Sequence, residues 1–222
     1  MDEMIDVDAL VEALIEREGG YVNNSADKGG PTCFGITEAV ARANGYSGAM
    51  RSLPREEAAA IYKRLYWLRP RFGDVALRSA GIAAELFDTG VNMGPAVAVT
   101  FLQRALTALN RNGRDYPDLV PDGRVGSQTL AALDAFLELR GKTSAERVLL
   151  RSLEALQGER YLRLAERRPG NYILDKAAHG TRLAAWTTFL LLASSTLLQP
   201  ASTLRLCVGA TFPSASIAVR LM

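Results

Sequence analysis

Helical periodicity constrains this 222-residue chain more than any other feature, because almost no segment alternates polar and apolar residues with the period of two expected of a strand. Prolines and glycines separate most of the periodic stretches. The pattern predicts a mostly α chain in which residues 68–77 form a loop. The helices are expected near residues 5–17, 53–67, 78–91, 96–110, 129–139 and, capped by Thr143, up to residue 168.

Residues 19–36 are the exception to this pattern. The run GGYVNNSADKGGPTCFGI contains five glycines, one proline and two asparagines, a density of turn-forming residues that excludes a long helix. We expect two short extended pieces joined by a turn, followed by a short helix that Thr37 caps. The predicted fold is therefore helical, with a small β-hairpin lobe.

The composition argues against several classes of function. With 26 Lys and Arg residues against 24 Asp and Glu residues, the chain gives no general reason to expect a nucleic acid as partner. Cys33 and Cys207 lie far apart, so we expect no disulfide framework. One histidine, His179, and two distant cysteines build no common metal site, and no cofactor is expected.

Glu18 is the residue that physical reasoning singles out. It ends the first helical stretch and directly precedes Gly19 and Gly20, which stop a helix. The C-terminal end of a helix disfavours negative charge, which favours the protonated carboxyl group that a general acid needs. Position alone fits a solvated surface glutamate better.

The turn-rich segment adds further groups near Glu18. Asp27 follows nine residues later, Thr32 and Thr37 supply hydroxyl groups, and Tyr21 supplies an aromatic ring. Glycosidases use an acid on one side of the scissile bond and a carboxylate or a positioned water on the other, and this set suits that arrangement. Asp27 suits a turn-stabilising role equally well.

The run EGGYVNNSADKGGPTCFGIT closely resembles the signature of glycoside hydrolase family 108, the holin-associated N-acetylmuramidases common in phages and prophages. The sequence departs from the family pattern at Asn24, where an aspartate is common, and Cys33 stands at a variable position, so we do not interpret it as a nucleophile. The matching positions are Glu18, Gly19, Gly20, Tyr21, Asn23, Asp27, Gly29, Gly30, Thr32, Gly35, Ile36 and Thr37.

Two later segments extend this resemblance. FDTGVNMGP, residues 87–95, resembles the second cleft segment of the family and places Asp88 and Asn92 one helical turn apart, although both side chains also suit the backbone at the Gly-Pro break. Residues 97–168 resemble a peptidoglycan-binding-like part. Its Asp-Gly-x-x-Gly-x-x-Thr unit, from Asp122 to Thr129, is predicted to fix a loop.

The resemblance implies a lysozyme-like helical domain that hydrolyses the β-1,4 bond between N-acetylmuramic acid and N-acetylglucosamine in peptidoglycan. Glu18 would be the general acid, and Asp27 and Thr32 would orient water or stabilise positive charge at the anomeric carbon. The alternatives are a lytic transglycosylase, which lets a hydroxyl group of the sugar attack, and a non-catalytic wall-binding protein or prophage remnant. The implied sugar-binding residues are Tyr21, Asn24, Thr37, Trp67, Asp88 and Asn92, although the aromatic residues of YKRLYW are more typical of a core.

We expect three parts: residues 1–95 as the catalytic part, 96–170 as the peptidoglycan-binding-like part, and 171–222 as an atypical apolar tail. The last 47 residues carry four basic side chains and no acidic one. Residues 183–198 are a short apolar run that suits a membrane anchor, a hydrophobic extension or out-of-frame translation, and we favour a frameshift after codon 168.

The N-terminus has the acidic, periodic character of a first helix and not that of a signal peptide. We therefore expect synthesis in the cytoplasm and action on the cell wall after release that a holin assists.

Overall fold

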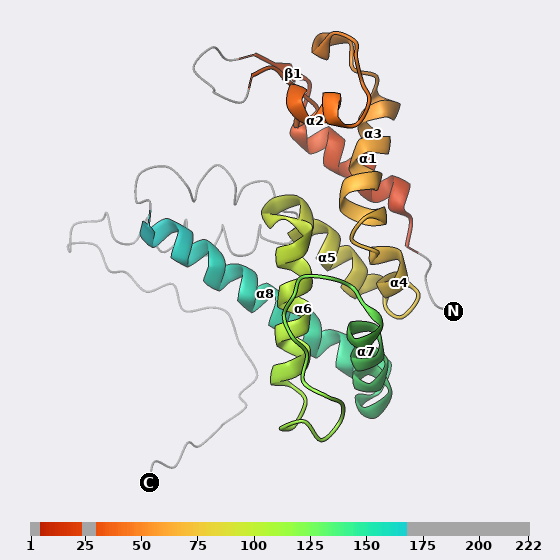
Figure 1. The fold of residues 1–222 in the computed structure, drawn as a ribbon, viewed down its shortest axis with the longest axis vertical. Coiled ribbons are helices and arrows are strands. Elements are labelled where there is room, and N and C mark those ends of the chain that lie inside the picture. The colour runs from red at the N-terminus through yellow and green to blue at the C-terminus, as the bar shows by residue number, and fades with distance from the viewer. Residues whose placement is uncertain (1–4, 24–29, 168–222) are drawn as a thin grey trace, which may run out of the picture.

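The computed structural model describes residues 5–23 and 30–167, and this part of the chain is mostly helical, as the sequence predicts. Figure 1 shows the strands and α2 gathered at one end of the molecule and α7 at the other. The α-helices are α1 (Val7–Glu18), α2 (Glu38–Ala43), α3 (Arg55–Lys63), α4 (Phe72–Ala76), α5 (Ala80–Met93), α6 (Pro95–Ala108), α7 (Ser127–Arg140) and α8 (Lys142–Arg167).

The helices begin where polar side chains satisfy free N–H groups. Asp6 caps α1 by accepting from the Ala9 N–H at 3.0 Å, and Ser79 caps α5 by accepting from the Ile82 N–H at 3.1 Å. The expected cap at Thr143 is wrong, because α8 begins one residue earlier. There the Gly141 carbonyl accepts the first helical hydrogen bond.

The predicted loop at residues 68–77 is also wrong. A π-helical turn, η2 (Arg64–Leu68), extends α3, and α4 follows directly after Arg71, whose φ of 62° turns the chain. Phe72 and Val75 are fully buried, so tertiary packing stabilises a helix too short for periodicity to reveal.

The small lobe is a three-stranded antiparallel sheet in the order β1–β2–β3, rather than two extended pieces. Each strand has two residues: β1 (Tyr21–Val22), β2 (Thr32–Cys33) and β3 (Ile36–Thr37). Phe34 and Gly35, both with positive φ, join β2 to β3 as a two-residue hairpin turn. A 3-10 turn, η1 (Met50–Ser52), leads from this lobe to α3.

One hydrophobic core runs through the described residues. Next to the small sheet, α1 packs on α3. Helix α5 lies between these two helices and the helices α6 and α8 (Figure 1). The largest side chains that the core buries completely include Leu14, Ile61, Phe72, Leu102 and Phe136. The expected border at residues 95 and 96 therefore crosses a continuous core.

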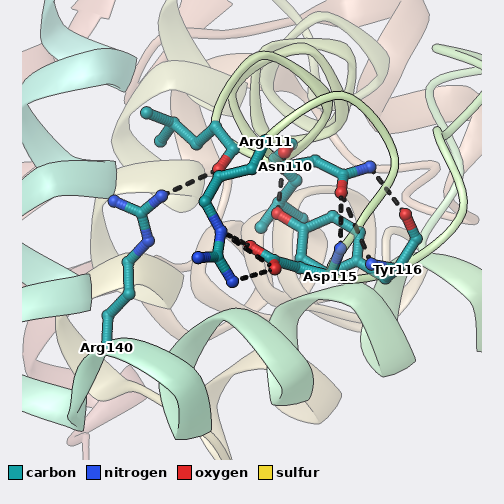
Figure 2. A network of polar contacts seen from close by, with 7 residues as sticks. Asn110, Arg111, Asp115, Tyr116 and Arg140 are labelled. Carbon is teal, nitrogen blue, oxygen red and sulfur yellow. Dashed lines mark hydrogen bonds and ion pairs between the residues drawn. The ribbon is translucent and has the colours of Figure 1, made fainter.

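The long connection between α6 and α7 is fixed by buried amides. Asn110 is fully buried, and its Nδ2 donates to the Tyr116 carbonyl and to Asp118 Oδ1, both at 2.7 Å. Its Oδ1 accepts the N–H groups of Asp115 and Tyr116 at 3.3 and 3.4 Å. Figure 2 shows this network beside Arg140, which reaches the connection from α7. One side chain thus replaces the hydrogen bonds that a regular element would provide.

Gln103 fixes the second half of the same connection. Its Nε2 donates to Asp122 Oδ1 at 2.7 Å and to Thr129 Oγ1 at 3.1 Å, and its Oε1 accepts the Gly123 N–H at 3.0 Å. A Cβ atom at Gly123 would lie 2.9 Å from the Ala96 carbonyl oxygen, so only glycine fits. The predicted loop-fixing role of the unit Asp122 to Thr129 is confirmed.

Candidate active site

Glu18 lies exposed at the last position of α1, where the sequence places it. Val11, Leu14 and Ile15, which precede Glu18 on the same side of the helix, are buried, and Gly19, with φ of 75°, ends the helix. The helix is held on α3 by the Glu12–Arg55 ion pair, at 2.6 Å. The carboxyl group of Glu18 is therefore carried by a rigid element while it remains open to a ligand.

The hairpin turn between β2 and β3 reaches this carboxyl group. A Cβ atom built on Gly35 would lie 2.7 Å from Glu18 Oε2 and 2.7 Å from the Tyr62 hydroxyl oxygen. Those two oxygens are therefore separated by at most twice that distance. The Tyr62 O–H donates to the Phe34 carbonyl at 2.9 Å, which ties the turn to α3. Gly35 thus leaves room for Glu18 beside the phenol.

Two tyrosines form an aromatic wall beside Glu18. The Tyr62 and Tyr66 rings are 5.8 Å apart. Burial, and then the charge of Glu18, raise the pKa of both phenols, so both are neutral at physiological pH. The sequence analysis grouped Tyr62 and Tyr66 with the core-like aromatic residues of YKRLYW and named neither as a site residue. The signal was their spacing of four residues, which places both rings on one helical face.

The sheet register separates the predicted residues of the hairpin into two faces. Thr32 is paired with Val22 and Thr37, while Tyr21 is paired with the buried Cys33. Because directly paired side chains point to the same face, Thr32 and Thr37 share the face opposite the core. Their partners are nearby backbone groups: Thr32 Oγ1 lies 3.5 Å from the Val22 carbonyl, and Thr37 Oγ1 accepts from the Val40 N–H at 3.3 Å.

Tyr21 lies on the core side of the sheet, half-buried, with the Arg51 guanidinium 5.1 Å from its ring centre. Burial raises the pKa of the Cys33 thiol, which agrees with its assignment as a packing residue. Asn24 and Asp27 lie outside the described residues.

Trp67 belongs to the core. Its side chain is 7% exposed and packs edge-on against Phe72 and Phe87, with ring centres 6.5 and 6.2 Å apart. A ring buried in this way offers no free face to a sugar, so the expected substrate-binding role of Trp67 is not supported.

Asp88 and Asn92 lie one turn apart on α5, as expected. The Asn92 amide donates to the Asp88 carbonyl at 2.9 Å and lies 3.4 Å from Asp88 Oδ2. Arg17 Nη2 is 3.8 Å from Asp88 Oδ1, so this pair faces the end of α1 that carries Glu18. The structure thus places Glu18, Asp88 and Asn92 in one region.

Within the ranges 5–23 and 30–167, acidic, histidine and cysteine side chains form no cluster suited to a metal ion. In the same ranges no helix is long and apolar enough to cross a bilayer, and the apolar run 183–198 lies outside them.

A mostly helical domain with an exposed glutamate at a helix end beside a small sheet defines the lysozyme-like class of folds. Residues 11–94 match the family model described as Glycosyl hydrolase 108, and residues 97–187 match the model described as Predicted Peptidoglycan domain. The chain therefore carries a glycosyl hydrolase 108 domain followed by a peptidoglycan-binding domain, and this pair of domains supports a glycoside hydrolase that acts on peptidoglycan.

A solved structure supports this fold. The chain is similar to the one in the "Structure of Brucella abortus SagA", with 24% sequence identity, a TM-score of 0.53, and coverage of 86% of this chain and 93% of that chain. No curated protein matches the chain significantly.

The second family match extends beyond the expected end of the resemblance. It continues to residue 187, whereas the resemblance was expected to end near residue 170. The match therefore spans the change in composition after Asp175, and the frameshift after codon 168 stays a prediction.

Proposed function

We propose that the chain is an N-acetylmuramidase that hydrolyses the β-1,4 bond between N-acetylmuramic acid and N-acetylglucosamine, with Glu18 as the general acid. The observation that carries the proposal is the position of Glu18: its carboxyl group is exposed at the rigid end of α1 and lies against Gly35 and the neutral Tyr62 phenol. A proton donor in a glycosidase needs access to the glycosidic oxygen and a fixed geometry.

In this mechanism Glu18 donates its proton to the glycosidic oxygen while the bond from that oxygen to the anomeric carbon breaks. Positive charge develops on the sugar, and a water molecule adds to the anomeric carbon and loses a proton to a carboxylate. Asp27 is the sequence candidate for this second carboxylate. Thr32 is the candidate for orienting the water, because its side chain lies on the sheet face opposite the core.

The test measures the release of new reducing ends from purified peptidoglycan. Glu18→Gln keeps the shape of the side chain but removes the acid, so we expect a loss of about 10²- to 10⁴-fold in kcat. Glu16→Gln is the matched control, because Glu16 is exposed on the same helix and pairs with Arg55 at 3.6 Å. Equal activity of the two variants would contradict the role of Glu18.

The products separate hydrolysis from transglycosylation. A muramidase releases fragments with a free reducing muramic acid, whereas a lytic transglycosylase forms the 1,6-anhydro sugar by attack of the sugar's own hydroxyl group. Mass spectrometry distinguishes the two because they differ by one water molecule. Anhydro products would overturn the proposal, and a folded chain that releases neither product would indicate the wall-binding alternative.

A further inference from the structure

Helix α8 belongs to the peptidoglycan-binding part of the sequence, yet one of its faces leads toward the region of Glu18. Leu153, Gln157 and Tyr161 follow one another at intervals of one turn along this face. Leu153 and Gln157 are buried, whereas Tyr161 is half-buried. The face therefore leaves the core at Tyr161 while it still follows α5.

Gln157 fixes the register between α8 and α5. Its Nε2 donates to Glu85 Oε1 at 2.5 Å and to Thr89 Oγ1, two side chains one turn apart on α5. Tyr161 comes one turn later on α8 and lies close to Asp88, whose charge adds to burial in raising the pKa of the Tyr161 phenol. Packing and hydrogen bonds thus hold Tyr161 beside the polar face of α5.

That polar face continues to the catalytic end of α1. Arg17 pairs with Asp88 at 3.8 Å and directly precedes Glu18, while Asn92 donates to Asp88 from the next turn of α5. Arg17, Asp88 and Tyr161 therefore form a series of neighbouring side chains that begins next to Glu18 in the sequence. Sugar sites combine an aromatic face for the C–H surface of the ring with a few polar groups for its hydroxyls, and this series supplies both.

We propose that Tyr161 stacks on a sugar ring of the glycan strand, so that α8 forms one wall of the substrate-binding site. The inference rests on the proposed muramidase function and adds a binding residue to it. In this arrangement the second domain binds the same strand that Glu18 cleaves, next to the scissile bond, rather than a separate part of the wall.

The test uses the full chain carrying Glu18→Gln, so that the ligand stays intact. Its ligand is a soluble tetrasaccharide of alternating N-acetylglucosamine and N-acetylmuramic acid, with binding measured by calorimetry. Adding Tyr161→Leu keeps an apolar side chain on α8 at its contact with α5 but removes the ring, and we expect the Kd to rise about three- to tenfold. Tyr161→Phe keeps the ring and should remain within about twofold of the parent chain.

Leu162→Ala is the matched control, because Leu162 is 52% exposed on the neighbouring face of the same helix. If Tyr161 only packs α8 against α5, Tyr161→Leu will lower the midpoint of thermal unfolding and leave the Kd equal to that of Leu162→Ala. That result, or a parent chain that does not bind the tetrasaccharide, would overturn the inference. Cleavage is measured separately with Glu18 present, so the failure of the hydrolytic mechanism is distinguishable from the failure of Tyr161 as a binding residue.

Discussion

The chain contains two connections rich in turn-forming residues, one between α1 and α2 and one between α6 and α7, and they are held in different ways. In the second, the buried amides of Gln103 and Asn110 bond to the polar groups of the loop itself. In the first, a short strand ladder and the Tyr62 phenol hold the backbone, and the exposed Glu18 carboxyl group lies beside the turn. Similar composition therefore serves a candidate site in one place and a structural loop in the other.

The largest expected effect is a loss of enzymatic activity when a methyl group is added at Gly35, in the first connection. In Gly35→Ala the new Cβ would lie 2.7 Å from both Glu18 Oε2 and the Tyr62 hydroxyl oxygen, so the carboxyl group must move. Because a displacement of about 1 Å costs roughly 100-fold in rate, we expect a loss of that order in kcat. Reducing-end release from peptidoglycan measures it.

Gly30→Ala separates this effect from backbone strain. Gly30 has φ of 70°, close to the 71° of Gly35, but a Cβ there would meet no atom within 4 Å. Both variants should therefore lose about 1 kcal/mol of stability, while only Gly35→Ala loses most of its activity. Equal activity of the two would show that the approach of Gly35 to Glu18 does not matter for catalysis.

The second connection should respond in stability and not in chemistry. Gln103→Leu leaves Asp122 Oδ1, Thr129 Oγ1 and the Gly123 N–H without their buried partner, so we expect a loss of about 2–4 kcal/mol in the free energy of unfolding. Urea unfolding measures this loss, and kcat of the folded fraction should change less than about threefold.

Gln128→Leu is the control for this change, because Gln128 is exposed on α7 in the same part of the molecule. Its stability should stay within about 0.5 kcal/mol of the parent chain. A comparable loss in both variants would mean that the buried hydrogen bonds of Gln103 do not hold the connection.

The same contrast explains what the sequence could predict. Glu18 at a helix end and the turn that Asp122 makes with the Arg124 N–H are local patterns, whereas the bonds of Gln103 to that turn join residues about 20 apart in the sequence. Periodicity likewise identified the long helices. By contrast, α4 depends on the burial of Phe72 and Val75 by distant helices, which no local pattern contains.

The remaining parts of the site depend on pairs of residues far apart in the sequence. Tyr62 meets the turn at Phe34, Arg17 meets Asp88, and Gln157 meets Glu85. Spacing along the chain places Tyr62 and Tyr66 on one helical face, but it says nothing about such contacts, so the position of Tyr62 beside Glu18 and that of Tyr161 beside α5 come only from the folded structure. Trp67 is the opposite case. The resemblance implied a sugar-binding role for it, and the folded structure buries its side chain in the core.

The smallest expected effect concerns acid stability, and it too belongs to the second connection. The Gln103 amide, with further help from the Arg124 N–H, lowers the pKa of Asp122 below its ordinary value, and Arg111 does the same for Asp115. Since the folded-state pKa lies below the unfolded one, the contribution to stability is complete above about pH 4 and is lost as the pH falls through the lower folded value.

Urea unfolding at pH 6 and at pH 3 of the parent chain and of Asp122→Asn tests this linkage. At pH 6 the parent chain should be more stable than Asp122→Asn. The difference in stability between these two proteins should shrink at pH 3, where protonation removes the charge that Gln103 and Arg124 stabilise. In a Gln103→Leu background the pH-dependent difference should also shrink, because the first cause of the shift is then absent. A difference that persists unchanged at pH 3 would mean that the Asp122 side chain supports the connection through its shape and its accepted hydrogen bonds, without a contribution from its charge.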